Sequence, residues 1–128
     1  MINLLISKEL GFQTLLKVSE RFKTKDIKVL TIDDSKDKRT KLKEISNFCK
    51  EKNINICFSS SKRQTHDFLV DNSTSITLVA CWYQLIPEKT LVELEKPIIG
   101  IHNSLLPKFR GGSPLVWTIL TGEDFFGY

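Results

Sequence analysis

Cysteine is scarce in this 128-residue chain, and none of it is arranged in pairs. The three cysteines, Cys49, Cys57 and Cys81, are odd in number and far apart, and no C-x-x-C pair is present. That spacing argues against a disulfide framework and against a zinc site, so we expect no metal. All three lie in apolar patterns or at a strand end, so we expect buried free thiols and a cytoplasmic location.

Long hydrophobic runs are also absent. No apolar stretch approaches the length needed to cross a bilayer, so we expect no membrane partner. The first residues, Met1 to Ser7, lack a basic region and a small-residue cleavage site, so they do not resemble a signal peptide. We expect them to form the first strand.

The glycine and serine signatures of several common active sites are missing. No G-x-G-x-x-G follows the first strand and no Walker-type loop is present, which disfavours a dinucleotide or ATP cofactor. No G-x-S-x-G elbow is present, which disfavours Ser104 as a hydrolase nucleophile. The hydrophobic fraction of 41% and charged fraction of 27% are ordinary globular values, so residues 1–128 are expected to form one domain.

Positive charge is concentrated in one stretch. Residues 23–52 hold ten lysines and arginines against six acids, which equals the whole net charge of +4. Such a stretch suits either an RNA or phosphorylated acceptor, or a solvated lysine-rich helix. We favour the solvated helix, because the only aromatics among these basic residues, Phe48 and the flanking Phe22, fit core positions.

Apolar periodicity alternates between strand-like and helix-like segments along the chain. Helical spacing of apolar residues, or a proline at a helix start, predicts helices at 12–22, 40–52, 63–70, 87–94 and from about Pro114. Short apolar runs predict strands at 1–7, 27–32, 54–58, 76–81 and 98–101. Strands joined by helical crossovers predict an α/β fold with a mostly parallel, doubly wound, Rossmann-like sheet.

Residues 98–122 are the most informative stretch. The strand from Ile98 to Ile101 brings His102 to the mouth of an apolar loop, Ser104-Leu105-Leu106-Pro107, which is followed by Arg110-Gly111-Gly112. Open α/β sheets bind ligands at the carboxyl ends of their strands, so His102 is placed where a functional site is expected.

The sequence His-Asn-Ser-Leu-Leu-Pro-Lys-Phe-Arg-Gly-Gly-Ser-Pro, starting at His102, resembles the signature of the folate-dependent formyltransferases. That family's pattern is Asn-x-His-x-Ser-Leu-Leu-Pro, followed by Arg-Gly and a helix with an aromatic residue, here Trp117. Weaker similarity extends back through Cys81-Trp82-Tyr83-Gln84-Leu85-Ile86-Pro87. The family moves a formyl group from 10-formyltetrahydrofolate to a primary amine on a nucleotide, an aminoacyl-tRNA or an amino sugar.

The resemblance implies roles for particular residues. His102 is implied to be the catalytic residue, because an imidazolium donates a hydrogen bond and a positive charge to an oxyanion. The folate is implied to lie against Ser104, Leu105, Leu106 and Pro107, with Leu85 and Ile86 as an opposing wall. Arg110 is expected either to bind an anionic part of the acceptor or to hold the loop through a salt bridge. Partners are therefore a folate and an amine, with nucleic acid only if the acceptor is tRNA.

Two departures from the family pattern affect the expected activity. Gly100 stands where the family has an asparagine, and the aspartate of the family lies beyond Tyr128. Asn103 is expected to point elsewhere, because it follows the histidine by one residue and both strand alternation and the turn direct it away. Three aromatics among the last four residues suggest that the sequence is a fragment, truncated at its carboxyl terminus, and we expect these 128 residues alone to be inactive or nearly so. The alternative is a non-catalytic, folate-binding remnant of such an enzyme.

Overall fold

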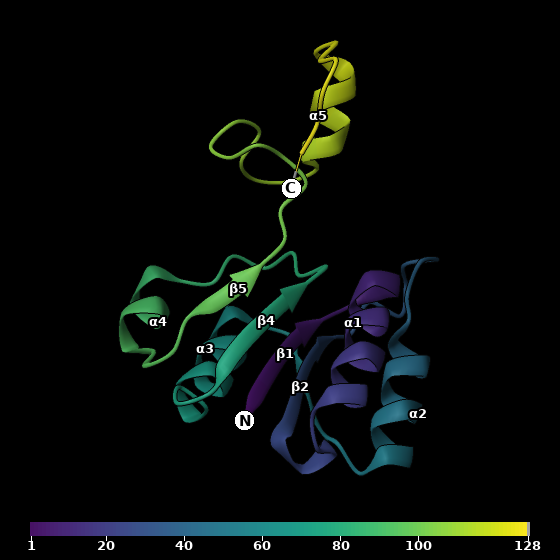
Figure 1. Cartoon of the computed structure of the whole chain (residues 1–128), viewed down its shortest axis with the longest axis vertical. Helices are drawn as coiled ribbons and strands as arrows, with labels where there is room; N and C mark the ends of the chain where they lie inside the picture. The colour runs from purple at the N-terminus through teal and green to yellow at the C-terminus, as the bar shows by residue number, and fades with distance from the viewer. Residues whose placement is uncertain (128) are drawn as a thin grey trace.

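The computed structural model describes residues 1–127 and contains one five-stranded sheet (Figure 1). All neighbouring strands are parallel and follow the order β3-β2-β1-β4-β5, with Leu4 of β1 opposite Val29 of β2 on one side and Leu78 of β4 on the other. The strands are β1 (Ile2–Ile6), β2 (Ile27–Ile32), β3 (Asn55–Ser59), β4 (Ile76–Ala80) and β5 (Ile98–Gly100). The α/β fold with a doubly wound sheet is therefore confirmed, and its strands are all parallel.

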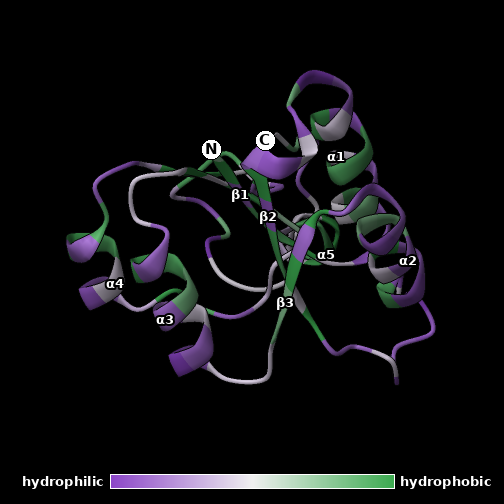
Figure 2. Ribbon diagram, turned by 90° about the horizontal axis from the view of Figure 1, so that it is seen from below, coloured by the Kyte–Doolittle hydropathy of each residue, from purple (hydrophilic) through white to green (hydrophobic). Residues whose placement is uncertain are grey.

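Helices connect the strands and cover both faces of the sheet. They are α1 (Lys8–Arg21), α2 (Leu42–Lys52), α3 (Lys62–Asp71), α4 (Glu88–Glu93) and α5 (Pro114–Leu120), with a 3-10 turn, η1, at Thr24–Asp26. Figure 2 shows α1 and α2 on one side of the strands and α3 and α4 on the other. Helix α1 begins at Lys8, earlier than the predicted residue 12. The first turn contains Gly11 and the charged Glu9, so it lacks the apolar periodicity on which the prediction was based.

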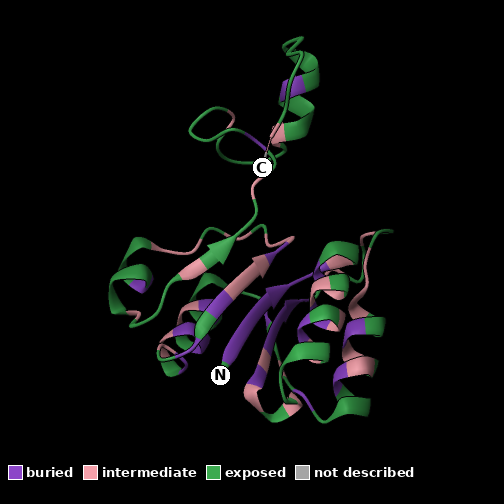
Figure 3. Ribbon diagram, viewed as in Figure 1, coloured by how far each residue is buried: buried purple, intermediate pink, exposed green. Residues whose placement is uncertain are grey.

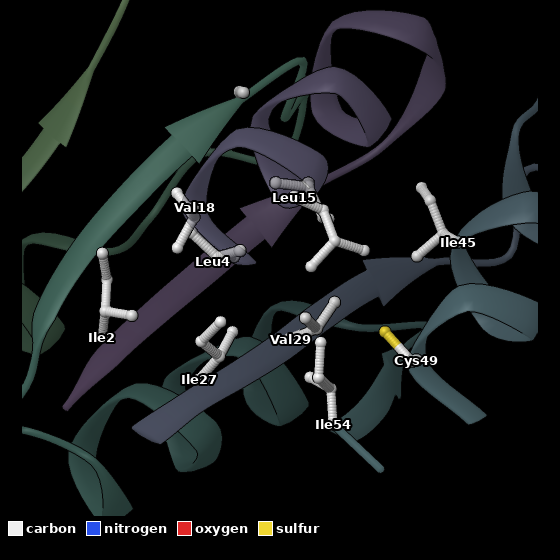
Figure 4. Packing of buried hydrophobic residues seen from close by; sticks show 11 residues of the cluster. Ile2, Leu4, Leu15, Val18, Ile27, Val29, Ile45, Cys49 and Ile54 are labelled. Atoms are coloured by element: carbon white, nitrogen blue, oxygen red, sulfur yellow. The ribbon is translucent and has the colours of Figure 1, made fainter. Parts of the chain in front are cut away.

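The core is divided by the sheet. Leu4 and Leu5 are adjacent and both fully buried, because alternate side chains of a parallel strand point into the two helical layers. Leu4 packs with α1 and α2 in the larger cluster, whose side chains Figure 4 shows at close range. Leu5 packs with α3 in the smaller cluster, together with Leu30 and Leu69.

Two sequence expectations about the core are wrong. Phe22 is 48% exposed, because it follows the last turn of α1 and extends beyond the layer; Phe48, by contrast, packs edge-to-face on Phe12 at 6.2 Å between ring centroids. Cys57 is exposed, because it lies on the edge strand β3, where no helix covers it, and Cys81 is half-buried. Only Cys49 is buried as expected, and burial raises the pKa of its thiol to about 12.

The segment after β5 projects away from the sheet (Figure 1). It comprises the 102–113 loop, α5 and the residues that follow, held together by a Lys108–Glu123 salt bridge of 2.6 Å and by close contact of Gly127 with Leu105. Most residues of this segment are exposed (Figure 3), and among its apolar residues Ile119 is 70% and Phe125 83% exposed. Tyr128, the last of the terminal aromatics, lies outside the described residues. No helix among residues 1–127 is long and apolar enough to span a bilayer.

Close packing of α1 on the sheet depends on Gly11. A Cβ at this position would lie 2.9 Å from Ile6 Cβ and 3.2 Å from the carbonyl oxygen of Ala80, and neither atom is the end of a flexible side chain. We expect Gly11→Ala to destabilise the fold by about 1–3 kcal/mol, despite alanine's higher helix propensity of about 1 kcal/mol.

Urea unfolding, followed by far-UV circular dichroism, measures this effect. Gly112→Ala is the matched control, because a Cβ there meets no atom within 4 Å and Gly112 does not have a left-handed φ. Equal unfolding midpoints for the two variants would contradict the close-packing role of Gly11.

Candidate active site

A cavity of about 600 Å³ lies at the carboxyl end of the sheet. The chain runs from β1 outward to β2 and β3, then returns to the other side of β1 to form β4, so the order reverses between β1 and β4. Ligand crevices in open α/β sheets form at such reversals. The cavity wall is built from residues that follow β1, β4 and β5: Lys8, Leu10, Val79, Cys81, Trp82, Tyr83, Gln84, Leu85, Ile101, His102, Asn103, Gly111, Gly112, Ser113 and Pro114.

The backbone turns sharply where β1 and β4 end. Lys8 and Cys81 both have a φ of 55°, which is left-handed and uncommon for residues with side chains. Ser7 links the two turns, because its hydroxyl donates to the Cys81 carbonyl and its amide to the Ala80 carbonyl at 3.3 Å. At these turns the segments that follow β1 and β4 diverge, and the cavity lies between them.

His102 lies in the wall of this cavity, just beyond β5, and is half-buried. Its Nε2 is 3.0 Å from the carbonyl oxygen of Phe109. Because a carbonyl only accepts hydrogen bonds, Nε2 must carry a hydrogen. Nδ1 is therefore the ring nitrogen left to act on a ligand, as an acceptor when neutral and as a donor when the ring is protonated. The Phe109 carbonyl is a part of the site that the sequence did not indicate.

A second depression, of about 370 Å³, meets the cavity at His102. Its wall consists of Gly100, Ile101, His102, Ser104, Leu105 and Leu106. His102 is thus shared by two adjoining concave surfaces, one toward β1 and β4 and one toward the apolar loop. This arrangement suits a residue that acts between two ligands.

The structure divides the other residues singled out from the sequence. Leu85 lines the large cavity, whereas Ser104, Leu105 and Leu106 line the second depression. Ile86 packs against the core cluster on the α3 side, so it supports the wall from behind. Pro107 and Arg110 are exposed and lie in neither wall.

Asn103 lies in the large cavity, which differs from the sequence expectation. The expectation assumed strand alternation, but β5 ends at Gly100 and His102 and Asn103 belong to the following loop. Alternation therefore no longer governs where their side chains lie. Asn103 is exposed and lines the same cavity as His102.

Charged side chains beside the cavity form a network that the sequence did not reveal. Lys8 pairs with Asp37 and lies 3.7 Å from Asp34, while the Tyr83 hydroxyl donates to Asp34 at 3.0 Å. The hydrogen bond to Asp37 raises the pKa of Lys8, and hydrogen bonds from Arg39 and Lys8 hold the pKa of Asp37 well below its usual range. Burial raises the pKa of Tyr83. The network ties the loop after β2 to the start of α1.

Two buried polar atoms in the walls have no hydrogen-bond partner among residues 1–127. They are Nε1 of Trp82 in the large cavity and Oγ of Ser104 in the second depression. Buried polar groups are nearly always paired in folded proteins, so these two unpaired atoms are unusual features of the walls. No group of three or more His, Cys, Asp or Glu side chains in that range is arranged to hold a metal ion.

The fold and the site define an α/β protein whose ligand cavity, with a histidine in its wall, lies at the point where the strand order reverses. Comparison with known proteins identifies the class more closely. A family profile described as "Formyl transferase" matches residues 3–128. The chain therefore belongs to the formyl transferase family, as the signature at His102 indicated.

Curated relatives include methionyl-tRNA formyltransferases. The chain is 34% identical over 59 residues to the methionyl-tRNA formyltransferase of Ligilactobacillus salivarius, covering 46% of this chain and 19% of that protein. It is 31% identical over 80 residues to the methionyl-tRNA formyltransferase of Caldanaerobacter subterraneus subsp. tengcongensis, covering 60% of this chain and 26% of that protein. The chain thus matches about a quarter or less of the length of these relatives.

A solved structure shares the fold. Glycinamide ribonucleotide transformylase 1 from Symbiobacterium toebii superposes with a TM-score of 0.66 over 98% of this chain and 62% of its own, at 18% sequence identity. This likeness supports the fold described above.

Proposed function

We propose that the protein transfers a formyl group from 10-formyltetrahydrofolate to a primary amine, with His102 as the catalytic residue. The observation that carries the proposal is the position of His102, in the wall of two adjoining cavities with Nδ1 left free by the Phe109 contact. Membership of the formyl transferase family supports the type of reaction.

Formyl transfer needs a group that stabilises negative charge and handles a proton. The donor supplies the formyl carbon; the amine nitrogen bonds to it, and the bond from that carbon to the folate nitrogen then breaks. The formyl oxygen carries negative charge between the two events, and a protonated His102 stabilises it by donating from Nδ1. The proton that the amine loses balances the one that the departing folate nitrogen gains. His102 is the group in these walls suited to both tasks.

The residues in the walls fit a folate. The donor combines a flat, partly polar ring with an apolar linker, and the walls offer Trp82 and Leu85 on one side of His102 and Leu105 and Leu106 on the other. We place the folate against these residues and the amine acceptor toward Lys8 and Gln84.

The acceptor that we propose is an amine carried on tRNA. Methionyl-tRNA formyltransferases are among the curated relatives of this chain, and the aligned region covers up to 60% of it in the two described above. We assign Arg110 no direct contact with the acceptor, because it lies outside both walls.

Calorimetric titration with a stable reduced folate, 5-formyltetrahydrofolate, tests the binding part of the proposal. We expect saturable binding that Leu85→Asp weakens by about 10- to 100-fold, because burying a leucine contributes about 1.5–3 kcal/mol. Val92→Asp is the matched control, since Val92 on α4 is 80% exposed, as Leu85 is 77% exposed, and lies outside both walls. Equal losses in the two variants, or no binding to the unaltered protein, would contradict the proposed folate site.

A second candidate function is folate binding without transfer. Gly100 favours it, because glycine has no side-chain amide where the family pattern has that of asparagine. Loss of one oxyanion donor lowers rates about 100- to 1000-fold. Folate binding in the titration, with no formyl transfer to aminoacyl-tRNA by the intact protein, would support this second function over the first.

A further inference from the structure

A second concave surface, separate from the cavities at His102, lies between α3 and α4. It has a volume of about 480 Å³ and is lined by Lys62, Arg63, His66, Asp67, Pro87 and Lys89; we call it the basic depression. The two helices lie side by side on one face of the sheet (Figures 1 and 2), which brings Lys62 and Lys89 together from separate parts of the sequence.

Positive charge dominates this depression. Lys62, Arg63 and Lys89 are exposed cations, and Asp67 is the one acid among the residues that line the wall. Glu88, which precedes Lys89 in the sequence, begins α4 outside this wall. No salt bridge among residues 1–127 engages Lys62 or Lys89. The Arg63–Asp67 pair is long, at 3.9 Å, and its side chains are 90% and 57% exposed, so it holds Arg63 only weakly.

The depression has a rigid floor. His66 Nδ1 lies 2.9 Å from Oγ1 of Thr90, which is fully buried, so this hydrogen bond joins α3 to α4 beneath the cations. Lys62 and Arg63 occupy the first turn of α3, where the helix dipole adds partial positive charge. Three mobile cations above a fixed imidazole provide donors that suit a phosphate group.

The basic depression is connected to the large cavity. Segment 82–87 contributes Leu85 to the cavity wall and Pro87 to the depression. The Thr65 hydroxyl of α3 donates to Oε1 of Gln84 at 3.1 Å, and Gln84 lines the cavity. Segment 82–87 therefore borders both concave surfaces. A long anionic ligand that lies over α3 and α4 can extend along this segment to the cavity that contains His102.

We propose that the basic depression binds the phosphodiester backbone of an RNA that carries the acceptor amine. Its openness and its exposed, flexible cations suit a polymer of phosphates passing over a surface rather than a small phosphate enclosed by the protein. Its part in presenting the amine rests on the proposed function, but binding of RNA does not.

Some of the cations in the lysine-rich stretch 23–52 make contacts within the protein. Lys28 donates to Asn72, Lys41 pairs with Glu9 and Glu44, and Lys52 pairs with Glu51. These cations are already engaged within the protein. Other lysines of the stretch provide a control, because three of them can be neutralised, the same number as in the basic depression.

Fluorescence anisotropy with labelled tRNA, at several salt concentrations and without folate, tests the proposal. We expect Lys62→Gln/Arg63→Gln/Lys89→Gln to weaken binding at least about tenfold and to reduce the slope of log K against log salt by about two to three. The matched control, Lys23→Gln/Lys25→Gln/Lys50→Gln, removes three exposed positive charges elsewhere and should change binding less than about threefold. Circular dichroism verifies that both triple variants are folded.

Three outcomes would overturn the proposal: no binding of tRNA to the unaltered protein, equal losses in the two triple variants, or competition by inorganic phosphate as effective per phosphate as competition by unlabelled tRNA. The last outcome would assign the depression to free phosphate. The anisotropy measurement separates this proposal from the proposed function, because it is made without folate and reports RNA binding whether or not formyl transfer occurs.

Discussion

Replacing His102 with alanine should lower formyl transfer by the intact protein about 100- to 10,000-fold, the range that removal of a general acid–base group usually covers. The expectation follows from the position of His102 between two cavities and from its free Nδ1. Transfer of the formyl group from 10-formyltetrahydrofolate to aminoacyl-tRNA measures it. Alanine removes both the imidazole and its hydrogen bond to Phe109, so a second variant is needed to separate the two losses.

His102→Gln provides that separation. A glutamine amide can donate to the Phe109 carbonyl as Nε2 does, but it cannot carry a positive charge or exchange a proton at neutral pH. If His102 acts chemically, His102→Gln should be nearly as slow as His102→Ala. A rate close to that of the unaltered protein in His102→Gln would show instead that the histidine only holds the 102–109 loop.

Introducing an amide at position 100 should have the opposite effect. We expect Gly100→Asn to raise the rate of formyl transfer by about 100- to 1000-fold, the usual value of one oxyanion-stabilising donor. The structure has room for the change: a Cβ at Gly100 would lie 3.4 Å from Val79 Cβ, an ordinary contact, and Gly100 does not have a left-handed φ. Position 100 also lines the same depression as His102.

Gly100→Ala is the control for this gain, because it adds the same Cβ without a donor. Initial rates at saturating folate should increase in the asparagine variant alone. If the two variants have the same rate, position 100 is not where the donor is missing. Asn103, which lines the large cavity together with His102, would then be the residue to replace next.

The sequence predicted the elements of the fold well, because their signals are local. β2 agrees with the predicted range 27–32, and α5 begins at Pro114 as proline's preference for the first helical turn suggests. The start of α1 was misplaced because Gly11, which weakens a helical pattern, is present for close packing against Ile6 and Ala80. That reason depends on a contact with the sheet and has no signature in neighbouring residues.

The structure places some of the residues singled out from the sequence in the cavity walls and others outside them. His102, Leu85 and Ser104 lie in the cavity walls, whereas Ile86 supports a wall from the core and Arg110 lies outside. The family resemblance assigned roles to residues by their position in a motif. A position in a motif does not specify on which side of a loop each side chain lies. The sequence analysis excluded Asn103 because it applied strand alternation beyond Gly100, where β5 ends.

The sequence by itself determined the alternation of strands and helices and the family signature around His102. Periodicity, turn residues and motif spacing are properties of residues that are close together in the sequence. Folding in three dimensions was needed to expose Cys57 at the sheet edge, to join Lys8 with Asp37 and Tyr83, and to bring Lys62 and Lys89 to one depression. Burial and charge pairing depend on which distant segments pack together, and that pairing is absent from any short stretch of sequence.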